Sequence, residues 1–79
     1  MPSIHVEYFA ILREKVGKSS EDLQTGAETA GALFDELAAR HDFSSRANMK
    51  VAINDEFSDW NASLTDGDSV VFIPPVAGG

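Results

Sequence analysis

The sequence contains no cysteine among its 79 residues. This absence excludes a disulfide framework, a thiol nucleophile and a cysteine-ligated zinc site. The only two histidines, His5 and His41, lie far apart in the sequence and lack the spacing of a two-histidine metal site. Redox, thiol and metal chemistry are therefore not expected within this chain.

Positive charge is also scarce. Six basic residues stand against thirteen acidic ones, which gives a formal net charge of −7. This charge repels phosphate backbones and anionic lipids, so we expect neither a nucleic-acid partner nor a membrane partner, and it favours a protein with a basic docking face. Long apolar runs are missing too. No stretch approaches the ~18 apolar residues of a membrane span, and residues 1–5 lack the apolar core of a signal peptide, so we expect a cytoplasmic protein.

The sequence lacks a convincing catalytic constellation. Ser44 and Ser45 follow His41 closely, but nothing suggests a third group that would orient the histidine, and a polar loop explains them. The acidic residues near the C-terminus lack the 12-residue spacing of an EF-hand and are better explained as turn residues. They are Asp55, Glu56, Asp59, Asp66 and Asp68. No phosphate-loop pattern is present. On its own, the chain is not expected to be a catalyst.

Hydrophobic periodicity indicates alternating strands and helices. Period-two alternation predicts a strand over residues 4–8, a four-residue spacing predicts a short helix over 9–17, and a charged segment over 19–25 suits an antiparallel edge strand. A longer helix follows Thr29, its expected N-cap, and ends near Arg40 and His41. Residues 42–48 are predicted to form a loop.

The C-terminal half continues with strands. Residues 50–54 predict a strand that ends in a turn at 54–56, followed by an irregular return containing Phe57 and Trp60. A turn at 65–68 leads to the strand 69–73, which is apolar on both faces, as a central strand would be.

The order β, short α, β, α, β, β predicts an α+β fold, a mixed sheet curled around one main helix in the β-grasp or ubiquitin-like arrangement. The first and last strands would pair in parallel at its centre. One long helix can cover only one sheet face, so the other face should expose apolar groups or meet a partner. Residues 1–73 would form this domain, and residues 74–79 an extended C-terminal tail.

The tail reads Pro74, Pro75, Val76, Ala77, Gly78 and Gly79. Its prolines favour an extended polyproline II spacer, and six such residues reach roughly 19 Å. Glycines without side chains could enter a narrow site in another protein. The terminal carboxylate is ionised at pH 7 and must be activated, most simply as an acyl-adenylate. A protein amine would then give an isopeptide, whereas a sulfur donor would give a thiocarboxylate, an ionised sulfur nucleophile. Without cysteine, the terminus is the only position at which this chain could carry transferable sulfur.

Three segments together resemble the family of molybdopterin synthase small subunits, across nearly the whole chain. They are residues 8–17, with Phe-Ala-x-x-Arg-Glu, residues 64–68, with Leu-Thr-Asp-Gly-Asp, and residues 70–79, ending in Pro-Pro-Val-x-Gly-Gly. Residues 18–50 match this family only in pattern.

The resemblance implies a sulfur-donating small subunit whose catalytic pocket lies in the large subunit. An activating enzyme would use ATP and magnesium to adenylate Gly79, which then becomes the thiocarboxylate, while the chain itself binds no cofactor or metal. The tail would insert into the large subunit of a heterotetramer and pass sulfur to cyclic pyranopterin monophosphate to form molybdopterin. Alignment on the motifs implies that Phe9, Phe57 and Ile73 contact the partner. Core packing is the alternative for Ile73 and, less so, for Phe9.

Three other readings stay open. The thiamine-pathway sulfur carrier shares the fold and the Gly-Gly terminus but usually lacks the Pro-Pro-Val run. A ubiquitin-like protein modifier can share this tail. A β-grasp interaction domain with an inert tail is the third alternative.

Overall fold

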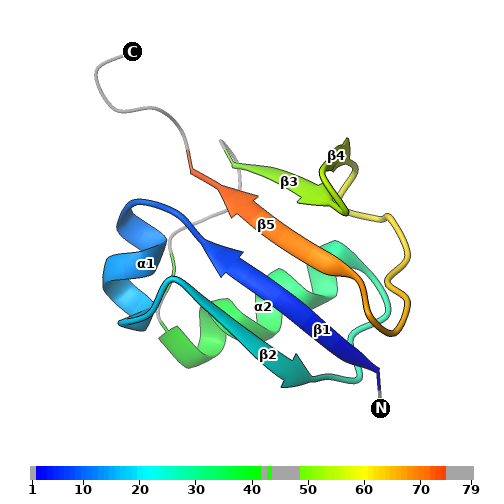
Figure 1. The fold of residues 1–79 in the computed structure, drawn as a ribbon, viewed down its shortest axis with the longest axis horizontal. Coiled ribbons are helices and arrows are strands. Elements are labelled where there is room, and N and C mark those ends of the chain that lie inside the picture. The colour runs from blue at the N-terminus through cyan, green and yellow to red at the C-terminus, as the bar shows by residue number, and fades with distance from the viewer. Residues whose placement is uncertain (1, 42, 44–48, 75–79) are drawn as a thin grey trace.

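The computed structural model describes residues 2–41, 43 and 49–74. Five strands and two helices follow one another along the chain (Figure 1). They are β1 (Ser3–Tyr8), α1 (Ile11–Val16), β2 (Ser20–Gln24), α2 (Ala30–His41), β3 (Lys50–Ile53), β4 (Glu56–Ser58) and β5 (Ser69–Ile73).

The strands form one mixed sheet in the order β2-β1-β5-β3-β4. The first and last strands, β1 and β5, are parallel and lie in the middle of this sheet, whereas the other pairings are antiparallel. The helix α2 runs behind one face, while none of the described helices lies over the opposite face (Figure 1). The predicted β-grasp arrangement, its central parallel pair and its uncovered sheet face are confirmed.

The core lies between α2 and the covered face of the sheet. Leu33, Phe34 and Leu37 of α2 are buried, as their helical spacing predicts. Phe34 contacts the ring of Phe72 on β5, with 5.4 Å between ring centroids, and Trp60 stacks on Phe72 at 6.0 Å. Trp60 is partly buried against this core. Thr29 caps α2, because its Oγ1 accepts a hydrogen bond from the backbone N–H of Ala32 at 3.1 Å.

The predicted turn at residues 65–68 holds the start of β5 beside the start of β1. Gly67 has φ 91°, and its N–H donates to the carbonyl of Ser3, so this turn fastens the start of β1. Asp66 and Asp68 accept hydrogen bonds from the backbone N–H groups of Ser3 and Thr65. The acidic cluster therefore consists, at this turn, of groups that bind the backbone. Within the described ranges, no group of three or more potential ligands could hold a metal ion.

Three sequence predictions are wrong in detail. The return after β3 is not wholly irregular, because Phe57 lies in the strand β4 and pairs with Ala52. Three residues are too few to reveal an alternation. The turn is Asn54–Asp55, both with positive φ, so that Glu56 already belongs to β4. The short helix begins at Ile11 rather than Phe9, since Ala10 has φ 51° and ψ −122°. Among the described residues, no helix is long and apolar enough to span a bilayer.

Candidate docking surface at the base of the C-terminal tail

The strand that leads into the tail is held on both sides. β5 pairs with β1 through residues 69–72 and with β3 through residues 70–73, and it ends at Ile73. Pro74 follows as the last described residue and is half-buried. The other predicted tail residues, Pro75 to Gly79, lie outside the described residues, and so does the predicted reactive carboxylate. What the structure describes is the platform from which the tail starts.

The uncovered face of β5 carries apolar side chains. Val70 and Phe72 point into the core and are fully buried, whereas Val71 and Ile73 alternate to the other face and stay half-buried. Across the β3–β5 pair, Val71 lies opposite Ala52. Across the β3–β4 pair, Ala52 lies opposite Phe57. The side chain of Phe57 is 76% exposed.

A strained turn adds a further aromatic side chain at the same end of the sheet. Phe9 directly follows the last residue of β1, and β1 runs parallel to β5, so Phe9 and Ile73 emerge at the same edge. Ala10 then takes a positive φ that residues other than glycine rarely adopt. Phe9 is 46% exposed, and Ile11, on the other side of this turn, is 49% exposed. We call the set Phe9, Ala52, Phe57, Val71 and Ile73 the apolar end of the sheet.

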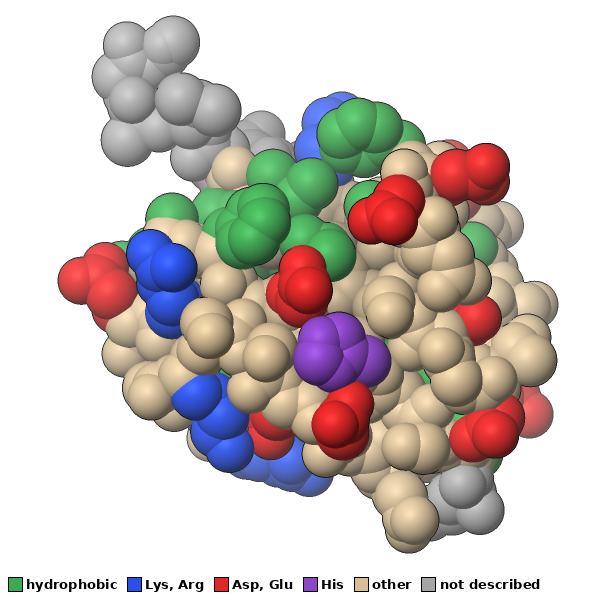
Figure 2. Space-filling view, in the orientation of Figure 1, with side chains coloured by type: hydrophobic (Ala, Val, Ile, Leu, Met, Phe, Trp, Pro, Cys, Tyr) green, Lys and Arg blue, Asp and Glu red, His purple; other side chains and the backbone are tan. Residues whose placement is uncertain are grey.

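The other half of the same face is polar. The Nδ1 atom of His5 lies 2.8 Å from Oδ1 of Asp22, and its Nε2 atom lies 3.7 Å from a carboxylate oxygen of Glu7. Figure 2 shows both halves: apolar side chains gather at one end of this face, whereas a histidine and charged side chains lie over the rest, among other polar side chains and backbone atoms. The face is therefore divided along its strands into an apolar and a charged part.

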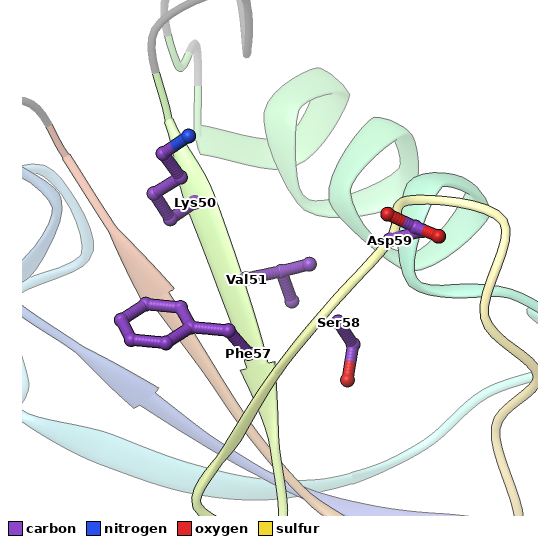
Figure 3. Close-up of a pocket in the computed structure, with 5 residues that line it drawn as sticks. All are labelled: Lys50, Val51, Phe57, Ser58 and Asp59. Atoms are coloured by element: carbon purple, nitrogen blue, oxygen red, sulfur yellow. The ribbon is translucent and has the colours of Figure 1, made fainter.

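An open hollow lies at the outer edge of the apolar end. It has a volume of about 430 Å³ and is lined by Lys50, Val51, Phe57, Ser58 and Asp59. Lys50 and Phe57 project on one side of β3, and Val51 and Ser58 on the other (Figure 3). The hollow forms because β4 ends at Ser58, so Lys50 has a strand partner only in β5.

One pair of ionisable groups is strongly coupled, but it is structural. The hydroxyl of Tyr8 donates a hydrogen bond to Glu21 at 2.5 Å. Burial, followed by this bond and the charge of Glu21, raises the pKa of Tyr8 well above its ordinary value. Partial burial acts to raise the pKa of Glu21, but the Tyr8 hydrogen bond and the Lys18 charge outweigh it, and the pKa is lowered. The pair joins β1 to the edge strand β2.

The structure describes some of the predicted site residues and not others. The predicted contact residues Phe9 and Phe57 are exposed and Ile73 is half-buried, so the structure places all three on one end of the uncovered face. The sequence analysis does not identify Val71 as a surface residue, although the alternation of Val71 with buried Val70 could have revealed it. Lys50 is identified there only as the first residue of a strand. Ser44 and Ser45, which were considered as nucleophiles, both lie outside the described residues. His41 stacks on the ring of Phe43.

Comparison with known proteins agrees with this geometry. Residues 6–79 match the ThiS family. The molybdopterin synthase sulfur carrier subunit of Escherichia coli K12 is 36% identical over 96% of this chain and 99% of the relative. The crystal structure of SAMP1 from Haloferax volcanii has a TM-score of 0.79 and 25% identity, covering 98% of this chain and 99% of that one.

A third comparison concerns an assembly. A complex of subunits 1 and 2 of the molybdopterin-converting factor from Helicobacter pylori contains a chain with a TM-score of 0.66 and 24% identity, covering 98% of this chain and 99% of that one. At this identity the likeness extends to the fold alone. The family match and the full-length identity together confirm the resemblance that the three sequence motifs carried: the chain belongs to the ThiS family, among its molybdopterin synthase small subunits.

Proposed function

We propose that this chain is the sulfur-carrier subunit of molybdopterin synthase and acts in molybdenum cofactor biosynthesis. The observation that carries the proposal is the position of the apolar end, which surrounds the point where β5 passes into the Pro-Pro-Val-Ala-Gly-Gly tail. A partner that covers this end also receives the tail. The relative from Escherichia coli bears the name of this activity.

The chemistry follows from the carboxylate of Gly79. An activating enzyme joins this carboxylate to the AMP moiety of ATP and releases pyrophosphate, because a free carboxylate is a poor electrophile. A sulfur donor then displaces AMP and leaves a thiocarboxylate. In the large subunit, the ionised sulfur attacks a carbon of cyclic pyranopterin monophosphate and displaces an oxygen substituent from that carbon, which forms a thioester between the two molecules. Water then cleaves the acyl–sulfur bond, which leaves the sulfur on the pterin and returns the carboxylate of Gly79. A second thiocarboxylated chain supplies the second sulfur of the dithiolene in the same way. The chain supplies the sulfur and its delivery, while the large subunit supplies the catalytic pocket.

Docking requires an exposed apolar surface that the isolated fold does not need. Phe57 and Phe9 are the side chains expected to enter the partner, since large aromatic residues dominate binding energy in such interfaces. Ile73 stands next to the tail and is expected to fix the direction in which the tail leaves the domain. The central position of β5 makes this starting point rigid.

Intact-mass measurement and reconstitution test the proposal together. Protein isolated from its native cell should contain a fraction in which one oxygen is replaced by sulfur. Thiocarboxylated protein, mixed with the large subunit and cyclic pyranopterin monophosphate, should form molybdopterin, and the variant that lacks Gly79 should form none while keeping its fold by circular dichroism. Normal product formation by that variant would overturn the proposal.

One specific observation favours a second function, protein modification. The SAMP1 structure shares 25% identity over nearly the whole chain, and a closely similar structure is described as a small archaeal modifier protein. The same acyl-adenylate would then react with a lysine amine instead of a sulfur donor. Conjugates linked through lysine in cell extracts would support this function, and extracts that contain only the free and thiocarboxylated forms would contradict it.

A further inference from the structure

One lysine interrupts the apolar end of the sheet. Lys50 lies opposite Ile73 in the β3–β5 register, directly beside the base of the tail, and it lines the hollow with Phe57. It is exposed, and it is the only lysine or arginine in the five described strands. The other described basic residues belong to α1, the turn that follows it, or α2; they are Arg13, Lys15, Lys18 and Arg40.

The described part of the fold makes no use of this cation. In the described part of the chain, no carboxylate lies within ion-pair distance of the Lys50 ammonium, although Lys18 and Arg40 each have such a partner. Asp59 lines the same hollow, but it lies on the other side of β3 and is not paired with Lys50 (Figure 3). Within the described residues, Lys50 is therefore an unpaired positive charge set between two apolar side chains, Ile73 and Phe57.

The consequence appears when a partner covers the apolar end. Burying an ammonium group without an anionic partner carries a large desolvation cost, so such an interface is stable only if the partner supplies a compensating group. The surrounding protein carries a net charge of −7, which favours a partner surface that is positive overall. An acidic side chain on that surface would then pair with Lys50 and would be repelled by most other parts of this chain.

We propose that Lys50 determines partner orientation and specificity by pairing with a carboxylate of the large subunit, at the base of the inserted tail. The inference rests on the proposed function, since it takes the large subunit as the occupant of the apolar end. The apolar contacts supply affinity, and the single inverted charge fixes the register in which the tail points into the partner's pocket. Lys50 contacts the partner and not the reacting atoms, so it is a positioning residue.

Binding measurements with three variants test the role of the charge. Lys50→Met keeps most of the apolar stem and removes the ammonium, Lys50→Glu inverts the charge, and Lys18→Met makes the first change at the opposite edge of the sheet. The affinity of each for the cognate large subunit is measured by calorimetry at low and high salt, after circular dichroism has confirmed the fold. We expect Lys50→Met to bind about tenfold more weakly and Lys50→Glu about a hundredfold more weakly. Lys18→Met should stay within about twofold of the wild type.

Salt dependence separates this proposal from an apolar role. The affinity of the wild type should fall as salt is added, and this fall should be smaller for Lys50→Met, because screening no longer weakens the lost pair. Equal or tighter binding of Lys50→Met would overturn the inference and make Lys50 an apolar contact through its stem. Self-association of the chain that Lys50→Glu abolishes would also overturn it, since a second copy would then be the occupant.

The outcomes for the two proposals are distinguishable. If the wild type binds the large subunit and forms molybdopterin but all three variants bind equally well, only the role of Lys50 fails. If the wild type neither binds the large subunit nor forms molybdopterin, both proposals fail.

Discussion

The two faces of β5 carry similar apolar side chains but differ in how deeply these side chains are buried. Val70 and Phe72 are fully buried under α2, whereas Val71 and Ile73, which alternate with them, stay half-buried on the uncovered face. A domain with one long helix can bury only one face of its sheet, so the second apolar face is more than this fold requires. The surplus is concentrated beside the tail, and a partner that receives the tail would cover it.

The clearest test of this difference in burial is to make the same valine-to-alanine substitution on each face of β5. Val70→Ala should destabilise the domain by about 2–3 kcal/mol, since two buried methyl groups are lost and a cavity remains. Val71→Ala should cost about 0.5 kcal/mol, because solvent already reaches this side chain. Urea denaturation followed by circular dichroism measures both values. Equal losses would mean that the two faces are buried alike in solution.

Substitutions on the uncovered face should affect binding to the large subunit more than they affect stability. Phe57→Ala should leave the free energy of unfolding within about 0.5 kcal/mol of the wild type, because the side chain is 76% exposed. Its affinity for the large subunit should fall by about 2 kcal/mol, or roughly thirtyfold, as expected for a large aromatic side chain that becomes buried in an interface. Calorimetric titration measures this change, and Phe9→Asp should behave in the same way. If Phe57→Ala instead lowered the free energy of unfolding and left the affinity for the large subunit unchanged, Phe57 would belong to the core.

The hydroxyl of Tyr8, on the covered side of the sheet, is paired with Glu21, and acid tests the contribution of this pair. Tyr8→Phe should cost about 1 kcal/mol near neutral pH, through the lost hydrogen bond to Glu21. The pKa of Glu21 is lowered in the folded protein, so its contribution to stability is present above the pKa of the unfolded state and is lost as the pH falls through the lower pKa of the folded state. Tyr8→Phe removes the main cause of that lowering.

The slope of stability against pH is the readout. Urea midpoints measured from neutral pH down through the range in which carboxylates titrate should fall less steeply for Tyr8→Phe than for the wild type. Lys18→Met, which retains the tyrosine bond, should keep more of the slope. An unchanged slope in Tyr8→Phe would show that other carboxylates account for the acid sensitivity.

Much of the fold could be read from the sequence because its signals are local. Thr29 caps its helix, Gly67 takes the positive φ that its turn needs, and the strand at 69–73 is apolar on both faces, as a central strand is. Phe57 was assigned to an irregular segment because β4 is defined by its pairing with β3 rather than by a pattern of its own. The importance of Lys50 also depends on pairing, since only the register with Ile73 brings it to the base of the tail.

The turn at Ala10 offers the smallest and most specific test of the uncovered face. Ala10 has φ 51°, a strained value for a residue with a Cβ atom, and it separates two exposed apolar residues, Phe9 and Ile11. Ala10→Gly should relieve strain and stabilise the domain by about 0.5–1 kcal/mol, less than the strain itself because glycine makes the unfolded chain more flexible. Thermal unfolding measures this gain.

The same variant should bind the large subunit a few-fold more weakly, since a glycine would hold Phe9 less firmly in the orientation that the partner meets. Gly17→Ala supplies the contrast, because it introduces the same kind of strain at φ 87°, at the far end of α1, and should lower stability without a specific effect on binding. If Ala10→Gly raises both stability and affinity, the strain has no role in presenting Phe9. Opposite changes in the two quantities would indicate that the fold gives up stability at Ala10 to keep the apolar end ready for a partner.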